Sequence, residues 1–470
     1  NVGDNFEPAL TAGDPGEIGS LIVRKDDSGQ WKDDNNRDWT QFVSGAQADL
    51  SGRVVGWDMQ DHDLAQINTQ TLAVSYTSRL MNVNAAVAVS PLDGRVIVVG
   101  TDATNEVRYQ PNLNGTFLRV LYAGVGATQP TAVVDLNPHL DYSLTTVVAS
   151  ERARSVGDPR GVVWDPDGSR FFVSGMGSNN VVAVAADGSR LGRLEVGQGP
   201  TGIVVSSDGT RGFVLNRFDG SVSSFNTDSL ETVQTISFYD PTPDVIKVGR
   251  PHLYDTHEGS GLGQMSCASC HVDARTDRLA WDLSVPNGSF SNGAHPMKGS
   301  MRTQSLMDII RFPSFHWRGD RLEMLDFNQT FTLLQGADSQ LNGAEIAELE
   351  AYLSTLHFPP NPYRNLDNSL SDEVTLPAGA SASVGDALQG RTLLNACIGC
   401  HGNGLSRSNQ SIDMFGQSFT PAAFHGLYKR IGYRADSATE SLSGFGFFHD
   451  GADALMTATR SADLLAALLS

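Results

Sequence analysis

Short alternating runs of apolar and polar residues dominate the first half of the chain, rather than long helical stripes. Val-rich segments are separated by Asp-Gly pairs, the strongest short-range signal for a β-hairpin turn. The pairs are Asp93-Gly94, Asp167-Gly168, Asp187-Gly188, Asp208-Gly209 and Asp219-Gly220. This pattern predicts antiparallel sheets of short strands up to about residue 245.

One β unit recurs at a fixed distance. Pro159 and Phe172 return as Pro200 and Phe213, an offset of 41 residues in both cases. A four-stranded propeller blade takes about 40–45 residues. The sequence therefore predicts an all-β propeller over residues 1–245, with irregular N-terminal insertions. The alternative is an ordinary β-sandwich, which has no reason to keep a fixed register.

Beyond residue 245 the Val-rich strands stop and helical patterns begin. Asn342 is placed to cap a helix over residues 344–356, and Glu345 completes a capping box. The expected apolar stripe of this helix consists of Ala347, Leu349, Tyr352, Leu353 and Leu356. A second helix is expected from residue 384 into Cys397. We therefore predict a multidomain chain whose second half is mainly α, with domains at 246–365 and 366–470.

All four cysteines lie in two pentapeptides, Cys267-Ala-Ser-Cys270-His271 and Cys397-Ile-Gly-Cys400-His401. Cysteines three residues apart share one edge of a helical turn, so both sulfurs can form thioethers with one porphyrin, and the adjacent histidine can ligate its iron. The alternatives are a zinc site, a redox dithiol or two disulfides, none of which needs a histidine after each pair. We predict two covalent haem c groups, with His271 and His401 as proximal iron ligands.

The formal net charge of −20 argues against nucleic acid or anionic lipid as a partner. It would suit a basic redox protein as donor or acceptor, although a solvated acidic surface is the commoner reason for such a charge. No apolar run approaches the roughly 20 residues of a membrane helix. The chain opens at Asn1, as a mature or trimmed product does. Because CxxCH motifs receive haem outside the bacterial cytoplasm, we expect a periplasmic or cell-surface protein.

Two family resemblances follow from these motifs. The repeated units that start at Asp158 and Gly199 resemble YVTN and lactonase-like β-propellers through their Pro-x-Gly and Asp-Gly elements. Residues 250–455 resemble the di-haem cytochrome c peroxidase family, including MauG-type enzymes. That match is carried by both CxxCH motifs, by Phe315-His-Trp317-Arg-Gly-Asp320-Arg321 and by Phe447-Phe-His449-Asp450-Gly451.

In the peroxidase family one haem reacts with peroxide, the second supplies electrons, and a tryptophan lies between them. The resemblance therefore implies a di-haem oxidoreductase in which Trp317 connects the haems; a packed core aromatic is the alternative for this residue. A non-enzymatic electron-transfer or docking protein is the rival function. A lactonase-type enzyme is a weaker option, because no cluster of acidic metal ligands stands out.

The distal iron ligands are the most open part of the resemblance. For the first haem, His295 in a Gly/Asn-rich loop is the candidate ligand and the second candidate catalytic residue; a surface histidine is the alternative. For the second haem, Asp463 stands where the family places Met or Tyr. Met456, His425 and Met414 are the substitutes.

Two further features of the family bear on this sequence. The Gln or Glu that acts on peroxide has no plain counterpart, and Asn328 is the nearest amide. Related peroxidases also hold calcium between their haems, largely through backbone oxygens. The Gly444-Phe-Gly446-Phe stretch is the candidate calcium site, with a simple Gly-rich turn as the alternative.

Overall fold

The computed structural model describes residues 22–48, 55–56, 61–106, 115–126, 130–283, 300–377, 380–402, 412–414, 417–421, 423–424, 426–430 and 461–470. The chain falls into two compact units. The propeller unit comprises Asp61–Asp273 and Phe327–Tyr352, and the second unit comprises Asn1–Gln60, Ala274–Asp326 and Leu353–Ser470. Within the described ranges, no helix combines the length and the apolar character needed to cross a bilayer.

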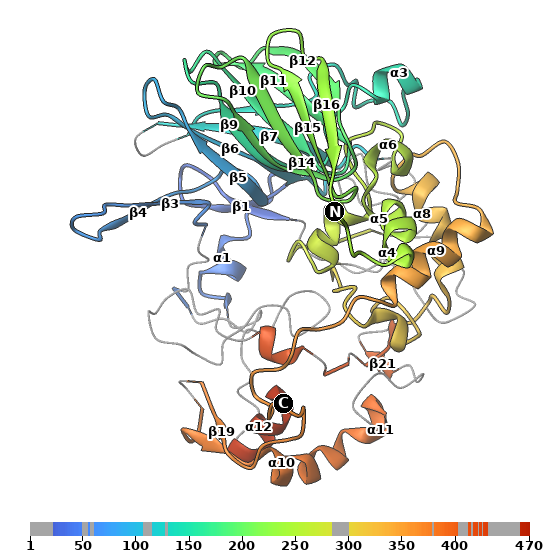
Figure 1. Ribbon diagram of the computed structural model, residues 1–470. Coiled ribbons are helices and arrows are strands. Elements are labelled where there is room, and N and C mark those ends of the chain that lie inside the picture. Colours follow the sequence, from blue (N-terminus) through green and yellow to red (C-terminus); the bar gives the residue numbers. More distant parts are fainter. Residues whose placement is uncertain are drawn as a thin grey trace, which may run out of the picture. The chain divides into compact units, whose positions relative to one another are not determined.

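The propeller unit contains three antiparallel sheets of four strands each (Figure 1). The first is β5 (Val83–Val89), β6 (Val96–Ala103), β7 (Leu118–Val125) and β8 (Pro130–Asp135). The second is β9 (Pro159–Trp164), β10 (Arg170–Gly175), β11 (Asn180–Ala185) and β12 (Arg190–Glu195). The third is β13 (Pro200–Val205), β14 (Arg211–Asn216), β15 (Ser221–Asn226) and β16 (Thr232–Ser237). A hairpin of β3 (Leu64–Ile67) and β4 (Val74–Thr77) precedes them.

In each sheet every strand pairs with the next strand of the chain, which is the pattern of a propeller blade and not of a Greek-key sandwich. The 41-residue repeat coincides with this architecture, because β9 and β13 begin at Pro159 and Pro200. The glycines of all five Asp-Gly pairs have φ values between 61° and 95°, as tight hairpin turns require. The propeller-type β fold of the first half is confirmed at this level.

The second blade is buried on both faces, because successive side chains of a strand point to opposite sides of the sheet. In β10, Phe171 and Val173 belong to the core shared with the first blade, whereas Phe172 belongs to the core shared with the third. The third blade differs on its outer face. There Val204 and Ile236 keep 58% and 57% of their surface exposed. The three described blades therefore do not close a ring by themselves.

Short helices complete the propeller unit: α3 (Ala149–Arg152), α4 (Asp244–Gly249), α5 (Pro251–Tyr254), α6 (Thr256–Gly259), α7 (Cys267–Cys270) and α8 (Asn328–Leu333). They are followed by α9 (Gly343–Leu353), the predicted capped helix. The backbone N of Asn342 donates to Glu345 Oε2 at 2.7 Å, and the backbone N of Ala344 donates to Asn342 Oδ1 at 2.9 Å, so the capping box is confirmed.

The predicted stripe of α9 needs two corrections. The helix ends at Leu353 rather than Leu356, and Ile346 takes the buried place expected for Ala347, which is exposed. Ile346, Leu349 and Leu353 are spaced i, i+3 and i+7, which places them on one helical face.

The second unit contains two-stranded pairs and short helices. The pairs are β1 (Val23–Lys25) with β2 (Trp31–Asp33), β17 (Ala280–Trp281) with β18 (Met301–Arg302), β19 (Val374–Thr375) with β20 (Val384–Gly385), and β21 (Ile412–Met414) with β22 (Gln417–Phe419). The α-helices are α1 (Thr40–Val43), α10 (Ala387–Leu393), α11 (Ile398–His401) and α12 (Ala462–Leu469), and the 3₁₀ turns are η4 (Ile309–Arg311), η5 (Met324–Phe327), η6 (Leu394–Ala396) and η7 (Leu427–Lys429). Because the helices described here are few and short, a mainly α second half is not confirmed.

The helix expected from residue 384 into Cys397 is broken in the structure. Strand β20 occupies its first residues, and Asp386 caps α10 by accepting a hydrogen bond from Gln389 N at 2.9 Å. The 3₁₀ turn η6 then separates α10 from α11. Helix α10 packs closely on α12, since a Cβ at Gly390 would collide with the carbonyl oxygen of Asp463.

The expected domain boundaries at 245/246 and 365/366 stay predictions. The structure adds that the segment leading into the first CxxCH motif belongs to the propeller unit, together with residues 327–352.

Candidate functional site

The first CxxCH motif forms a single helical turn. Helix α7 spans Cys267–Cys270, and His271 N donates to the Cys267 carbonyl at 3.0 Å. At the start of the turn, Ser266 N donates to Ser269 Oγ at 3.0 Å. Both cysteines are half-buried, and neither forms a disulfide. The two thiols therefore belong to one turn that is followed at once by a histidine, as thioether attachment and proximal ligation require.

Buried hydrogen bonds tie the segment before this turn to the propeller. Ser155 Oγ donates to the Leu262 carbonyl at 2.7 Å, and Gln264 Nε2 donates to the Gly115 carbonyl at 2.7 Å. Ser155 and Gln264 are fully buried. The blades therefore fix the backbone of the first motif through contacts that need no haem.

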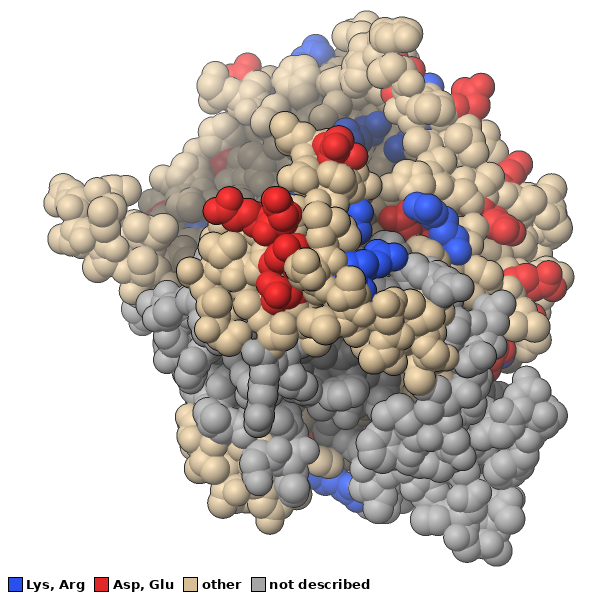
Figure 2. Space-filling view, turned by 90° about the horizontal axis from the view of Figure 1, so that it is seen from below, with Lys and Arg blue, Asp and Glu red and all other residues tan. Residues whose placement is uncertain are grey.

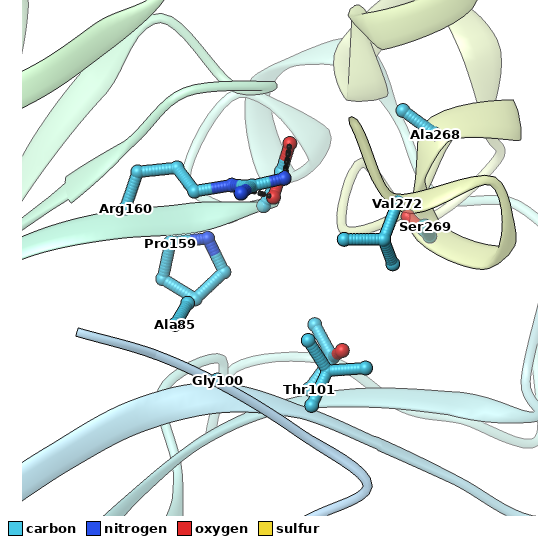
Figure 3. Close-up of a pocket in the computed structure, with 10 residues that line it drawn as sticks. Ala85, Gly100, Thr101, Pro159, Arg160, Ala268, Ser269 and Val272 are labelled. Carbon is cyan, nitrogen blue, oxygen red and sulfur yellow. Dashed lines mark hydrogen bonds and ion pairs between the residues drawn. The ribbon is translucent and has the colours of Figure 1, made fainter. Parts of the chain in front are cut away.

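A cavity of about 10 Å³ lies between the blades and the turn after Ser266 (Figure 3). Arg160 and Pro159 line one side, and Ala268, Ser269 and Val272 line the other. This volume is close to the minimum that holds one water molecule, so the cavity is a packing gap and not a haem pocket.

An ion-pair chain crosses the same region. Arg160 Nε lies 2.7 Å from Asp158 Oδ1, and its Nη1 lies 3.0 Å from Asp273 Oδ1. Burial raises the pKa of Asp158, and the Arg160 guanidinium opposes that rise. Arg160 therefore connects the inner strand of the second blade to the second residue after His271.

Gln335 is a buried polar side chain beside Cys267. Its side chain is 2% exposed, and its Nε2 lies 3.5 Å from Cys267 Sγ. Burial raises the pKa of the Cys267 thiol, and this hydrogen bond opposes the rise. The Oε1 atom of Gln335 is buried and has no hydrogen-bond partner within the described ranges. No sequence motif points to this residue, which lies 68 positions from the cysteine.

The second CxxCH motif also forms one turn. His401 N donates to the Cys397 carbonyl at 2.9 Å, and helix α11 contains Cys400 and His401. The His401 ring lies 4.2 Å from the Phe424 ring, tilted by 36°. Cys397 and Phe424 border the apolar cluster around Leu394, whereas Cys400 is exposed. An apolar wall beside one cysteine suits the edge of a porphyrin.

Trp317 is buried in the second unit and is held from two directions. Its side chain is 7% exposed, and its indole Nε1 donates to the Arg302 carbonyl at 2.7 Å. Its own carbonyl accepts a hydrogen bond from Thr420 N at 2.9 Å. Gly319, with φ 63°, lies so close to Thr420 that a Cβ would collide with its side chain. These contacts fix the Trp317 ring in place. A fixed ring is compatible both with an electron relay and with a packed core aromatic.

Two residues from the comparison with peroxidases have structural roles. Asn328 Nδ2 donates to the Leu341 carbonyl at 2.7 Å, and its Oδ1 accepts from Leu341 N at 2.9 Å. Asp463 Oδ1 accepts from Asp386 N at 2.8 Å. Both side chains are therefore engaged by backbone groups.

Several predicted site residues lie outside the described residues, namely His295, His425, Met456, the Gly444–Gly446 stretch and the His449-Asp450-Gly451 element. Within the described part of the chain, no three His, Cys, Asp or Glu side chains gather into a group that could hold a metal ion.

Figure 2 shows Lys and Arg side chains beside Asp and Glu side chains on one face, where several acidic groups gather near the middle of the view. The coloured part of this face carries side chains of both signs of charge.

Comparison with known proteins gives a partial likeness to propeller-type structures. No protein-family model matches the sequence, and no curated protein matches it either. Among solved structures, the hydrazine synthase of Kuenenia stuttgartiensis is 18% identical, with 38% of this chain and 41% of that chain covered and a TM-score of 0.24. The periplasmic gluconolactonase of Pseudomonas aeruginosa is 16% identical, with 38% and 50% covered and a TM-score of 0.27. The chain thus spans half or less of these proteins, and at such scores the likeness carries no argument.

Proposed function

We propose that this protein is an extracytoplasmic di-haem c-type oxidoreductase of the cytochrome c peroxidase and MauG type. In this proposal one haem reacts with peroxide and receives electrons through the second. The observation that carries it is the pair of single helical turns, each with two thiols followed immediately by a histidine. Haem bound there would supply a redox-active iron, whose reactivity depends on the axial ligands and the polarity of the pocket.

The chain's own residues have distinct tasks in this proposal. Cys267 and Cys270 hold the first haem and His271 ligates its iron, while the propeller keeps their turn in place. Gln335, beside Cys267, orients the first thiol by donating to its sulfur.

The second haem is held by Cys397 and Cys400 and ligated by His401, whose ring is oriented against Phe424. Trp317, with its ring fixed, serves as the electron relay that the resemblance implies.

One observation favours the rival function, a di-haem electron-transfer or docking protein. Asn328 is the amide nearest in sequence to the expected peroxide-binding position, yet its Nδ2 and its Oδ1 each already bond the backbone of Leu341. A peroxidase would then need its polar distal group from another residue.

Counting and classifying the haems tests both functions. Mass spectrometry of denatured protein from a host that matures cytochromes c should show two haem additions that survive acid–acetone extraction. Cys397→Ser combined with Cys400→Ser should leave one. A high-spin ferric EPR signal together with turnover of peroxide supports the peroxidase. Two low-spin haems that are inert to peroxide support electron transfer, and extractable haem would refute both.

A further inference from the structure

Arg302 is a buried cation beside Trp317. It is the last residue of β18, its side chain is 6% exposed, and its guanidinium carbon lies 5.6 Å from the centre of the Trp317 ring. Its Nε is buried and has no hydrogen-bond partner within the described ranges. A buried charge is strongly unfavourable unless an opposite charge and hydrogen bonds compensate it.

Among the described residues, the surroundings of Arg302 compensate its charge only in part. Burial, with the nearby charge of Arg430, lowers the pKa of Arg302 to about 9, so the side chain is still a cation at neutral pH. Asp277 is the nearby acid, but its carboxylate already accepts hydrogen bonds from Trp281 Nε1 at 2.8 Å and Leu279 N at 3.0 Å. Burial raises the pKa of Asp277 to about 6, which further weakens it as a counter-ion.

A short chain segment links this cation to the second haem motif. The backbone N of Thr420 donates to the Trp317 carbonyl, and Phe424 packs against the His401 ring. Four peptide units separate Thr420 from Phe424, and they span at most about 14 Å. Trp317 and His401 therefore both contact the short segment that runs from Thr420 to Phe424 in the second unit.

We propose that Arg302, whose guanidinium lies over the Trp317 ring, binds a propionate carboxylate of the haem attached at Cys397 and Cys400. The inference rests on the proposed function, because it needs that haem. A planar guanidinium matches a carboxylate with two parallel hydrogen bonds, and stacking on an aromatic ring leaves its edge available for them. Trp317 cannot provide the donor, since its Nε1 already bonds the Arg302 carbonyl.

The test uses the haem-loaded protein and three variants: Arg302→Gln, Arg302→Lys and the control Arg311→Gln. Arg311 belongs to the same unit, but its side chain is 66% exposed and pairs with Asp308. Mass spectrometry first establishes two covalent haems in each protein. Resonance Raman spectra then report the bending mode of the haem propionates, and a spectroscopic redox titration gives the potential of each haem.

We expect Arg302→Gln to shift a propionate mode and to lower the potential of one haem, because a positive charge that favours the reduced state is lost. Arg302→Lys should keep most of the potential but still shift the mode, since an ammonium replaces the planar fork. Arg311→Gln should match the parent. If Arg302→Gln does not fold, a parent-like mode in Arg302→Lys overturns the proposal.

The remaining outcomes separate the sources of the carboxylate. Parent-like modes and potentials in a folded Arg302→Gln protein with two haems overturn the inference and leave the proposed function standing. If, in addition, acetate raises the melting temperature of the parent but not of Arg302→Gln, the site takes a free carboxylate instead. A parent without covalent haem removes both the proposed function and this site.

Discussion

Val214 offers a direct test of how the blades are held together. It lies on β14, is fully buried, and belongs with Phe172 and Phe225 to the core between the second and third blades. Val214→Ala removes two methyl groups, worth about 1.6 kcal/mol at roughly 0.8 kcal/mol per buried carbon. Incomplete collapse of the resulting cavity raises the expected loss to about 2–3 kcal/mol. Val214→Asp should cost more, about 4 kcal/mol or above, because an unpaired carboxylate would be buried.

Val204 is the matched control. It is on the neighbouring strand β13, in the same blade, but 58% of its surface is exposed. Val204→Ala should therefore change the free energy of unfolding by less than about 0.5 kcal/mol. Urea unfolding of the haem-loaded protein, followed by far-ultraviolet circular dichroism, measures all three variants. Equal losses for Val214→Ala and Val204→Ala would show that these strands do not bury the faces described here.

Three other predictions concern pH, haem attachment and the first iron. Burial lowers the pKa of His139 to about 4 from 6.5, so between these pH values the unfolded chain binds a proton that the folded chain does not. The stability present above about pH 6.5 should therefore be lost as the pH falls towards 4, by roughly 1–2 kcal/mol after solvent screening. Denaturation measured at each pH should show a flatter slope for His139→Gln than for the parent. Gln335→Leu should raise the fraction of first haem held by one thioether, seen as a red-shifted α band of the pyridine haemochrome; an unshifted band would contradict an orienting role. His295→Gly should convert a low-spin ferric haem to high-spin and speed its reaction with peroxide. An unchanged EPR spectrum would show that His295 is a surface histidine and not an iron ligand.

Local patterns were the predictable part of this fold. The Asp-Gly turns and the repeat beginning at Pro159 and Pro200 need only nearby residues, and so does the Asn342 capping box. The break between α10 and α11 was not predicted. The apolar residues Leu388, Leu393 and Leu394 suggested one continuous helix. In the structure Leu388 and Leu393 are 54% and 47% exposed, and only Leu394 is buried.

Long-range contacts were the part that the sequence could not supply. Gln335 reaches Cys267 only because residues 327–352 fold onto the propeller unit, and Arg302 meets Trp317 across 15 positions without a motif around it. Neither residue type is unusual at its place in the sequence. Only their burial, with a polar atom that has no hydrogen-bond partner among the described residues, distinguishes them.

The position of the first motif in the propeller unit changes what the propeller does in the proposed enzyme. Freeing the motif from the blades would break the Ser155 and Gln264 hydrogen bonds, each worth about 0.5–1.5 kcal/mol net, and the ion pair between Arg160 and Asp273. Local opening at α7 is therefore unfavourable even before a haem is attached. A blade fold that forms first would present Cys267 and Cys270 on a turn of fixed geometry. The propeller is then a scaffold for the first haem, and a mutation in its blades should affect that haem.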